Sequence, residues 1–439
     1  MCGIAGVFGA RRVEVVERML ARLPHRGPDD VFTLAGEGFV LGATRLSILD
    51  VEGGRQPLTN ADQTVFACQN GELYDFVEAR EELRARGYSF ATGADTETLV
   101  HGYAEWGLDL PRRTVGMFAF AVWDARERLG LLARDRVGKK PLYYHLGEDG
   151  ALWFASEIKC LLEVPGVRRE VDPVAVDLYL SLKHVPSPRT AWRDVRQVPP
   201  GHQLVWRPGQ EPRIERYWSL DWSRRDLAPS DPDELAEAIL ERLERSVVRR
   251  LRSDVPLGFF LSGGIDSSLV TAIAASRAQT PVHTYTLTYA ASGTTPAKEL
   301  DRKCARLVAE RYDTIHVEET IETGDLSKDL PAVLAHFDEP FAGVISTFYL
   351  ARRITQDVKV ALSGDGADEI FGSYLSHRLG AALLQPASED ETLLKTHRLF
   401  PDALAIARQG GPEQRSRSVD GSDRGLVAPA TEIPEVVGL

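Results

Sequence analysis

The chain has 439 residues, with 52 basic and 64 acidic side chains and a formal net charge of −12. This balance argues against nucleic acid or an anionic membrane as a partner, because both attract a basic surface. The hydrophobic fraction of 43% is ordinary for a globular protein, and the length predicts two or three domains. The cysteines lie far apart at positions 2, 68, 160 and 304, which indicates a reducing, cytoplasmic setting rather than disulfides or a zinc site.

The first half of the chain alternates short strand patterns with a few helical ones. Stretches rich in β-branched and aromatic residues predict strands within 41–50, 63–75, 115–135, 141–145 and 151–157. Residues 125–128, "ARER", are placed to form the turn of a hairpin. Apolar periodicity predicts helices over 13–23 and 76–87, the second ended by Gly87. Together these elements predict a layered α+β domain.

The second half of the chain differs in composition and in its pattern of predicted elements. Segments rich in Pro and Gly at 198–212 and 227–234 predict a domain boundary, and a helix is expected over 233–254. Apolar strands then alternate with helices, which predicts an α/β domain with a doubly wound parallel sheet. Beyond about residue 385 the composition is that of a loop or tail. We therefore expect domains at 2–215 and 230–385, followed by a weakly structured or truncated remainder at 386–439.

Cys2 stands directly behind the initiator methionine. If Met1 is removed, this residue carries both a thiol and a free α-amine, whose ordinary pKa of about 8 suits a general base. Taken alone, the position favours a terminus that has no role. The motifs that follow favour function: "CGIAGVFG", "LPHRGPDD", "TRLSI", "QNGELYD", "GADTETL", "RDRVGKKPLYYH", "FASEIKCLL" and "PPGH". In this order, from residue 2 to about residue 210, they resemble the class II glutamine amidotransferase domain, an N-terminal-nucleophile hydrolase of αββα layers.

This resemblance implies a role for each motif residue. Cys2 is the expected nucleophile, with Asn70 and Gly71 as oxyanion donors. Arg45 is expected to hold the substrate carboxylate, and Asp95 the substrate ammonium. The expected glutamine-binding set is Arg45, Ile48, Gly71, Glu72 and Asp95. Considered singly, Asn-Gly is typical of a hairpin turn, Arg45 of a surface ion pair, and Asp95 of a helix N-cap.

The stretch "PLGFFLSGGIDSSLVTAI" predicts an apolar strand, a tight turn and a helix. Adjacent glycines at 263 and 264 let backbone N–H groups converge on an anion, and the helix N-terminus adds its positive end. No P-loop lysine follows, so transfer of a γ-phosphate is not expected. The alternative is a simple Gly-Gly turn with a capping serine. The motif resembles the pyrophosphate loop of ATP pyrophosphatases, which split ATP into AMP and pyrophosphate.

A second acidic, glycine-rich turn, "VALSGDGADEIFGSY", also follows an apolar strand. Carboxylates beside phosphate oxygens are what Mg²⁺ prefers, so Asp266 and Asp368 are the candidate metal ligands. The expected ATP-binding residues from both turns are Leu261, Ser262, Gly263, Gly264, Asp266, Ser267, Ser268, Leu287, Ser363, Gly364 and Asp365.

The two halves together, over about 2–380, resemble glutamine-hydrolysing asparagine synthetases. The resemblance implies that Cys2 releases ammonia from glutamine and that the ammonia passes through an internal tunnel. It also implies that ATP and Mg²⁺ convert aspartate to an acyl-adenylate, which ammonia then turns into asparagine. The expected partners are these small molecules, with no nucleic acid and no membrane, and with a homodimer as one option.

The chain departs from this family pattern in three places. The long segment that usually follows the second turn is not recognisable. Residues 338–346 read "DEPFAGVIS" where "DEPFADSS" is usual, and Ser373 replaces a glycine. Two alternatives therefore stay open: amidation of a different carboxylate, such as a specialised metabolite, or a truncated glutaminase or nucleotide-binding protein that does not synthesise.

Overall fold

A computed structural model describes residues 2–221, 229, 231–290, 295–321, 325–340, 345–374 and 377. The chain divides into two compact units, Met1–Ser363 and Gly364–Leu439. The predicted remainder at 386–439 lies outside the described residues, and the domain boundaries stay predictions. Within the described part of the chain, no helix is both long and apolar enough to cross a membrane.

Two antiparallel six-stranded sheets occupy the N-terminal half. The first has the order β10-β8-β9-β1-β3-β2, with strands β1 (Gly3–Phe8), β2 (Asp30–Gly36), β3 (Phe39–Arg45), β8 (Tyr143–Leu146), β9 (Leu152–Ala155) and β10 (Arg196–Gln197). The second has the order β12-β11-β7-β6-β5-β4, with strands β4 (Leu58–Thr59), β5 (Val65–Leu73), β6 (Gly116–Asp124), β7 (Leu129–Arg134), β11 (His202–Trp206) and β12 (Arg213–Arg216).

Large aromatic side chains fill the space between these two sheets. Phe8, Phe39, Trp123, Phe154 and Trp206 are all buried there, and Phe8 stacks on Trp123 at a centroid distance of 5.6 Å. Apolar area removed from water at this interface is the main force that holds the layers together.

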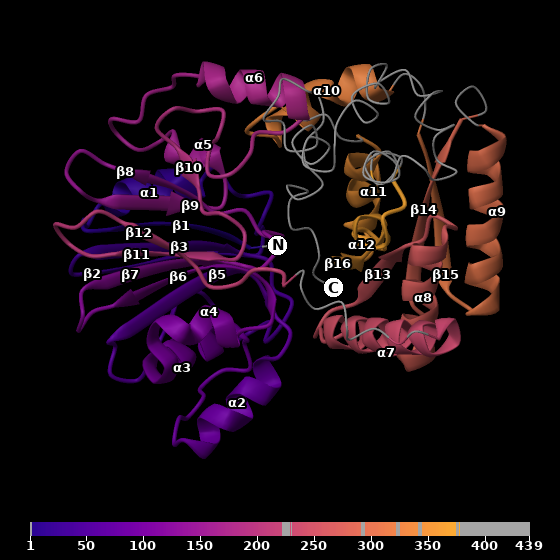
Figure 1. The fold of residues 1–439 in the computed structure, drawn as a ribbon, viewed down its shortest axis with the longest axis horizontal. Coiled ribbons are helices and arrows are strands. Elements are labelled where there is room, and N and C mark those ends of the chain that lie inside the picture. The colour runs from indigo at the N-terminus through magenta and orange to yellow at the C-terminus, as the bar shows by residue number, and fades with distance from the viewer. Residues whose placement is uncertain are drawn as a thin grey trace, which may run out of the picture. The chain divides into compact units, whose positions relative to one another are not determined.

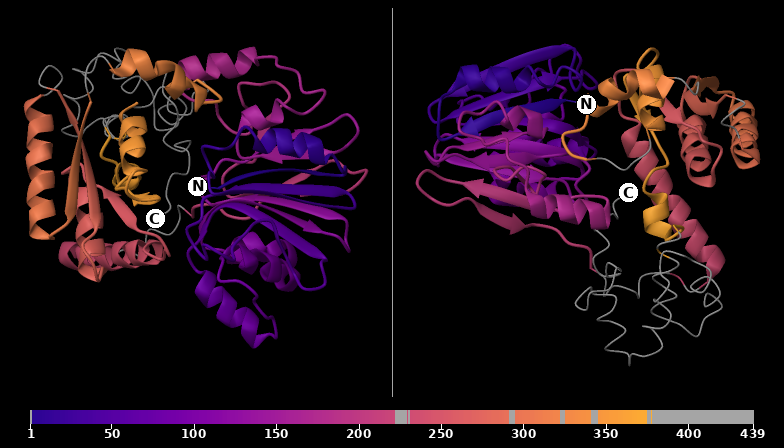
Figure 2. Two further views of the ribbon diagram at one scale, coloured as in Figure 1. Left: turned by 180° about the vertical axis from the view of Figure 1, so that it is seen from behind. Right: turned by 90° about the horizontal axis from the view of Figure 1, so that it is seen from above.

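Helices cover the outer faces of the two sheets (Figures 1 and 2). Helices α1 (Val13–Leu20) and α5 (Ile158–Leu161) pack on the first sheet, and α3 (Thr96–Trp106) and α4 (Leu110–Arg113) on the second. The same half of the chain also contains the helices α2 (Phe76–Ala85), η1 (Gly107–Asp109) and α6 (Pro173–Leu182). This arrangement is an αββα sandwich and confirms the predicted fold class of this half.

The C-terminal half contains a four-stranded parallel sheet of order β15-β14-β13-β16. Its strands are β13 (Leu257–Phe260), β14 (His283–Tyr289), β15 (Ile315–Ile321) and β16 (Val360–Leu362). The helices around it are α7 (Pro232–Arg250), α8 (Ile265–Arg277), α9 (Pro296–Arg311), α10 (Asp325–Ala335) and α11 (Ser346–Ile354). In Figure 1, α9 and α11 lie on opposite sides of β14, as a doubly wound sheet requires.

The strand order of this sheet reverses direction between β13 and its two neighbours, β14 and β16. In open α/β sheets, ligands bind outside the carboxyl ends of strands at such a switch point. The first predicted nucleotide turn begins there, because it follows β13, and Ser363, the last residue of the first unit, follows β16. The sheet thus explains why two similar turns recur in the sequence about a hundred residues apart.

Local sequence signals account for several element ends. The side chain of Asp231 accepts hydrogen bonds from the backbone N–H groups of Asp233 and Glu234 at 2.9 and 3.1 Å, which starts α7 with Pro232 in its first turn. The "ARER" segment at 125–128 joins β6 to β7 as predicted.

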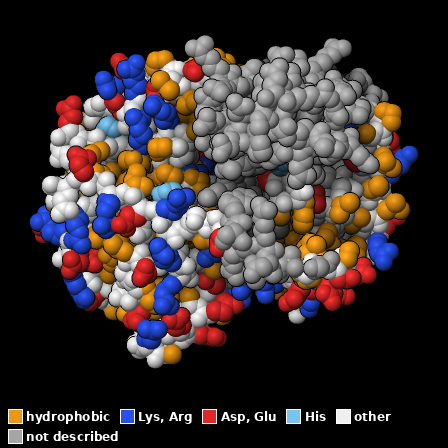
Figure 3. Space-filling view, viewed as in Figure 1, with side chains coloured by type: hydrophobic (Ala, Val, Ile, Leu, Met, Phe, Trp, Pro, Cys, Tyr) orange, Lys and Arg blue, Asp and Glu red, His pale blue; other side chains and the backbone are white. Residues whose placement is uncertain are grey.

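Basic and acidic side chains are intermingled over the described surface in Figure 3.

Candidate active sites

Cys2 lies immediately before β1, which runs between β9 and β3 in the first sheet. Its side chain is buried, and the thiol sulfur Sγ lies 3.8 Å from the carbonyl oxygen of Leu46. Burial raises the pKa of the Cys2 thiol. The thiol is therefore protonated near neutral pH, and a reaction at this sulfur needs a base to remove the proton.

Asn70 and Gly71 lie inside strand β5, not in a turn. A Cβ at position 71 would overlap the carbonyl oxygen of Met117 and lie 2.7 Å from the Cα atom of Phe118, so only glycine fits there. Asn70 is fully buried, and in the described structure neither its amide nitrogen nor its amide oxygen has a hydrogen-bond partner. A buried amide without a partner is costly, so this side chain fits a donor that awaits a ligand.

Asp95 precedes α3 but does not cap it through its side chain. Instead, its oxygen Oδ2 accepts hydrogen bonds from the backbone N–H of Leu73 and from the Nε2 atom of Gln69, both at 2.8 Å. Asp95 therefore stands at the N-cap position of α3, but its carboxylate bonds to β5 and does not cap the helix. Asp95 is 5% exposed, and burial raises the pKa of its carboxyl group.

Glu72 shares the electrostatic surroundings of Cys2 and Asp95. Burial, followed by repulsion from Asp95, raises the pKa of Glu72 well above its usual range. The charges of Glu72 and Asp95 both raise the pKa of the Cys2 thiol in turn. The structure thus brings three predicted site residues into one buried cluster whose charge state is set collectively.

Arg45 ends strand β3 and is also buried. Its guanidinium donates hydrogen bonds to the backbone carbonyls of Leu49 (3.2 Å), Asp50 (2.6 Å) and Val51 (2.9 Å). These contacts shape the loop after β3, which contains Ile48, another predicted pocket residue. A substrate carboxylate at Arg45 has to share the guanidinium with these carbonyls or replace some of them.

Two further buried residues near this cluster were missed as site candidates in the sequence. Lys140 is 4% exposed, and burial lowers the pKa of its ammonium to about 8; Glu72 and Asp135 act in the opposite direction. Gln69 is fully buried and contacts Asp95 directly. The only signal for Lys140 was its place in the "GKKPLYY" motif, and Gln69 carried none beyond its neighbour Asn70.

The glycine-rich turn after β13 leads directly into α8. Gly263 has a φ of +86°, and a Cβ there would overlap the carbonyl oxygen of Asp301 on α9. The hydroxyl of Ser267 lies 2.9 Å from that of Ser262 and accepts the backbone N–H of Ser262 at 3.1 Å. Gly264 occupies the N-cap position of α8, so the turn presents backbone N–H groups at a helix N-terminus, as a phosphate requires.

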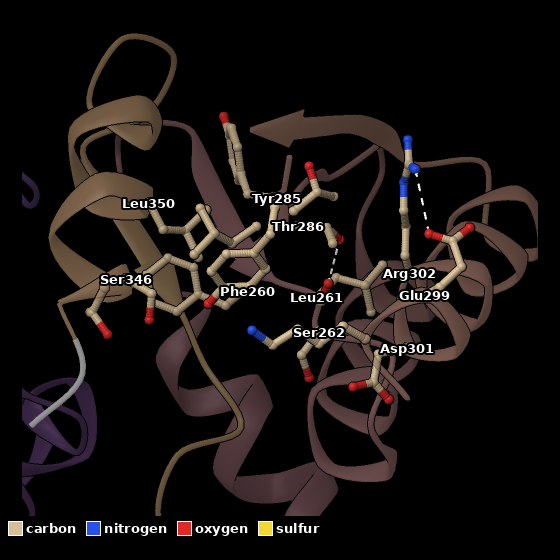
Figure 4. A pocket seen from close by; sticks show the side chains of 15 residues that line it. Phe260, Leu261, Ser262, Tyr285, Thr286, Glu299, Asp301, Arg302, Ser346 and Leu350 are labelled. Carbon is tan, nitrogen blue, oxygen red and sulfur yellow. Dashed lines mark hydrogen bonds and ion pairs between the residues drawn. The ribbon is translucent and has the colours of Figure 1, made fainter. Parts of the chain in front are cut away.

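A cavity of about 310 Å³ opens beside this turn, at the carboxyl ends of β13 and β14. Three of the predicted nucleotide-contacting residues line it: Leu261, Ser262 and Leu287. Figure 4 shows Phe260, Tyr285, Ser346 and Leu350 on one side and Glu299, Asp301 and Arg302 on the other. An apolar wall that faces a polar one suits a ligand with a flat ring and charged groups.

Asp266 is an exposed residue in the first turn of α8, and Ser268 follows in the same turn. Ser363 directly follows β16, the parallel neighbour of β13. Gly364, Asp365 and Asp368 belong to the second unit, so a joint site with the first turn stays a prediction.

Within the second unit, Gly366 has a φ of +101° and precedes α12 (Ala367–Phe371). The hydroxyl of Ser373 contacts the carboxylate of Asp368, and that of Tyr374 donates to Glu369 at 3.0 Å. Among the described residues, no group of three or more His, Cys, Asp or Glu side chains is arranged to hold a metal ion by itself. The donor chemistry of two carboxylates fits Mg²⁺ only if phosphate oxygens complete its shell.

Comparison with known proteins finds a matching family model for each half of the chain. A glutamine amidotransferase domain model matches residues 1–218, and an asparagine synthase model matches residues 238–425. The chain is 34% identical over 417 residues to the glutamine-hydrolysing asparagine synthetase 1 of Bacillus subtilis (strain 168), which covers 92% of this chain and 64% of that protein. It is 35% identical over 396 residues to asparagine synthetase 3 of the same organism, covering 85% of this chain and 63% of that protein.

A plant relative gives the same result. The chain is 32% identical over 394 residues to the glutamine-hydrolysing asparagine synthetase of Zea mays, covering 85% of this chain and 60% of that protein. The chain thus spans between 60% and 64% of the length of these three relatives. Because both domain models match in the expected order and the similarity runs through both halves, the chain belongs to the glutamine-hydrolysing asparagine synthetase family.

Proposed function

We propose that this chain hydrolyses glutamine at Cys2 and uses ATP to join the released ammonia to aspartate, giving asparagine, AMP and pyrophosphate. The observation that carries the proposal is Asn70, a fully buried amide without a partner in the described structure, fixed beside Gly71 in the same domain as the buried Cys2 thiol. The family to which the chain belongs supports the same reaction.

In the glutaminase half, the α-amine of Cys2, freed by loss of Met1, accepts the thiol proton as the sulfur attacks the amide carbon of glutamine. The oxyanion that forms accepts hydrogen bonds from the Asn70 amide and the Gly71 N–H. The C–N bond then breaks, and the amine returns the proton so that ammonia leaves. Water hydrolyses the resulting thioester to glutamate. Arg45 and Asp95 hold the carboxylate and ammonium of the substrate.

In the synthetase half, the side-chain carboxylate of aspartate attacks the α-phosphorus of ATP, and pyrophosphate leaves into the turn at 262–268. Leu261 and Leu287, which line the cavity beside this turn, are placed to contact the base or sugar. Mg²⁺, when bound, would neutralise phosphate charge, with Asp266 and Asp368 as its proposed protein ligands. Ammonia then displaces AMP from the acyl carbon. Shielding both reactive species from water prevents their loss.

One sequence feature favours a second candidate acceptor. Residues 343–346, "GVIS", stand where the family pattern has "DSS" with its acidic residue, and residues 341–344 lie outside the described part. Loss of a carboxylate near the acceptor favours a carboxylic acid that lacks the ammonium group of aspartate. A cytoplasmic location and a homodimer stay expectations that fractionation and light scattering can test.

A product assay tests the proposal. With ATP, Mg²⁺, glutamine and aspartate, the protein is expected to form asparagine, AMP and glutamate, and mass analysis is expected to show loss of Met1. Cys2→Ala should lose all use of glutamine but still form asparagine from ammonia. Cys68→Ala is the control, because Cys68 is also a buried cysteine but belongs to the core between the sheets. Glutamine hydrolysis by Cys2→Ala would exclude this nucleophile, and glutamate without AMP would exclude the synthetase half.

A further inference from the structure

Gln69 is a fully buried polar side chain in the centre of the glutaminase domain. It lies on β5 directly before Asn70, and its backbone N–H donates to the side-chain oxygen Oε1 of Gln56 at 2.7 Å. Its own amide nitrogen Nε2 donates two hydrogen bonds, to Oδ2 of Asp95 at 2.8 Å and to Oγ1 of Thr96 at 2.9 Å. Strand alternation sends this side chain to the opposite face from Asn70, toward α3.

The amide of Gln69 has only one orientation that fits its neighbours. Its oxygen Oε1 has no hydrogen-bond partner in the described structure. Reversing the amide would place this oxygen against the Asp95 carboxylate and would lose both donated bonds. A buried acceptor left without a partner costs free energy. The two hydrogen bonds donated by Nε2 offset this cost and explain why a glutamine is tolerated at this position.

Both donors from β5 converge on the same oxygen of Asp95. Gln69 and Leu73 stand four residues apart on one face of the strand, and each donates to Oδ2 at 2.8 Å. The other oxygen, Oδ1, receives no bond from β5 and accepts only a long hydrogen bond, at 3.5 Å, from the Thr96 hydroxyl among the described contacts. Two donors on one oxygen fix the rotation of the carboxylate and favour its charged form in a buried setting.

We propose that Gln69 is a positioning residue for the α-ammonium of glutamine: it holds Oδ2 of Asp95 so that Oδ1 stays charged, oriented and available to the substrate. This inference rests on the proposed glutaminase function and names a residue that acts through Asp95 without touching the substrate. Thr96 contributes to the same positioning, because its hydroxyl oxygen accepts the other hydrogen bond from Nε2 and fixes the orientation of the Gln69 amide.

Substrates with and without the ammonium group separate this role from a merely structural one. Glutamine carries the α-ammonium, and 4-carbamoylbutanoate is the same amide and carboxylate without it. For Gln69→Leu, kcat/KM for glutamine should fall roughly 10- to 100-fold, mainly through KM, because a hydrogen bond to a charged group is lost. The kcat/KM for 4-carbamoylbutanoate should stay the same. Thr96→Val should shift only the glutamine value in the same direction, by a smaller factor.

Gln203→Leu is the matched control, because Gln203 is a buried glutamine on β11 of the same sheet that donates instead to Glu215 at 3.2 Å. This control should change neither value. If Gln69→Leu does not fold, Gln69→Met, which keeps an unbranched side chain but removes the amide, carries the test in its place. Equal losses for both substrates in whichever variant folds, or no loss for either, would overturn the role of Gln69 and leave the glutaminase intact. A wild-type protein that does not hydrolyse glutamine would overturn the proposed function itself, and this inference with it.

Discussion

Gly71 on β5 packs against Met117 on β6 so closely that a Cβ at position 71 would overlap the Met117 carbonyl oxygen. The register of the two strands pairs Gly71 with Phe118 and Glu72 with Met117. Because β5 pairs with β6 along its whole length and contacts it closely at Gly71, the Gly71 backbone N–H and the Asn70 side chain are held in fixed positions. Rigid donors need no reorganisation when charge develops on a substrate oxygen, which is the condition for an effective oxyanion site.

Asn70→Ala should separate catalysis from stability. The kcat of glutamine hydrolysis is expected to fall by about 10²–10³-fold, as for loss of one oxyanion donor elsewhere. The melting temperature should not fall, because the Asn70 side chain makes no hydrogen bond in the described structure. Calorimetry and glutamate release measure the two quantities. A variant that melts much earlier and keeps its kcat would assign Asn70 to the core instead.

Glu97 makes a strong contribution to stability that depends on pH. Although burial opposes ionisation, hydrogen bonds from His101, from the backbone N–H of Ala91 and from Thr92 hold the pKa of Glu97 at about 2. A depressed pKa stabilises the fold above the ordinary carboxyl range and loses this effect as the pH falls toward 2. Glu97→Gln should therefore lower the free energy of unfolding at pH 7 by about 3 kcal/mol.

Denaturant titrations at several pH values test this prediction. The difference between wild type and Glu97→Gln should shrink steadily between about pH 4.5 and about pH 2. Glu82→Gln is the control, because the ion pairs of Glu82 with Arg86 and Arg113 are exposed and contribute little, so its free energy of unfolding should stay close to that of the wild type. A gap for Glu97→Gln that is constant across this range would show that its effect is packing and not charge.

Glutamine binding should weaken in acid because of the buried carboxylate pair. Burial, followed by repulsion from Asp95, raises the pKa of Glu72, and burial raises that of Asp95. Protonation removes the negative charge that attracts the substrate ammonium, so the KM for glutamine should rise as the pH falls through this raised range.

Glu72→Gln removes the partner carboxylate, so the KM profile of this variant should report the titration of Asp95 alone, and its midpoint should differ from that of the wild type. The profile for 4-carbamoylbutanoate, which has no ammonium, should lack the acid limb in both proteins. Steady-state kinetics from about pH 5 to about pH 9 measure both curves. An unchanged midpoint in Glu72→Gln would mean that the two carboxylates titrate independently.

Much of the fold was predictable because local signals and tertiary packing agree. Asp231 and Pro232 mark the start of α7, and the "ARER" segment forms the β6–β7 turn as expected. Apolar strands alternating with helices predicted the parallel sheet, since strands covered on both faces need no polar alternation. The order of the motifs along the chain was enough to indicate the family.

Two local interpretations of site residues missed the contacts that decide their roles, for the same reason. Asn-Gly alone favours a turn, but here it lies inside β5, where close contact with β6 requires glycine. Asp95 alone favours a helix cap, but its carboxylate bonds to β5. Each answer depends on a neighbour distant in the chain, which single-residue propensity does not contain. Gln69 was overlooked because its partner, Asp95, lies 26 residues away.

The two glycines of the proposed nucleotide turn should respond differently to substitution by alanine. Gly263 has a φ of +86°, and a Cβ there would overlap the carbonyl oxygen of Asp301 and lie 2.9 Å from the backbone nitrogen of Ala305. Gly264 has a φ of −72°, and the nearest atom to its Cβ is the Ser262 hydroxyl oxygen at 3.4 Å, an ordinary contact.

Gly263→Ala should therefore displace the turn from α9 and abolish ATP-dependent pyrophosphate release, while Cys2-dependent glutamine hydrolysis continues. Gly264→Ala should keep most of the ATP reaction, because alanine adopts its backbone angles without strain. Pyrophosphate release and glutamate release, measured on the same preparations, check both outcomes. If Gly263→Ala retains full pyrophosphate release, the turn does not hold the phosphates. If both variants lose it equally, the turn tolerates no added methyl group and strain at Gly263 is not the cause.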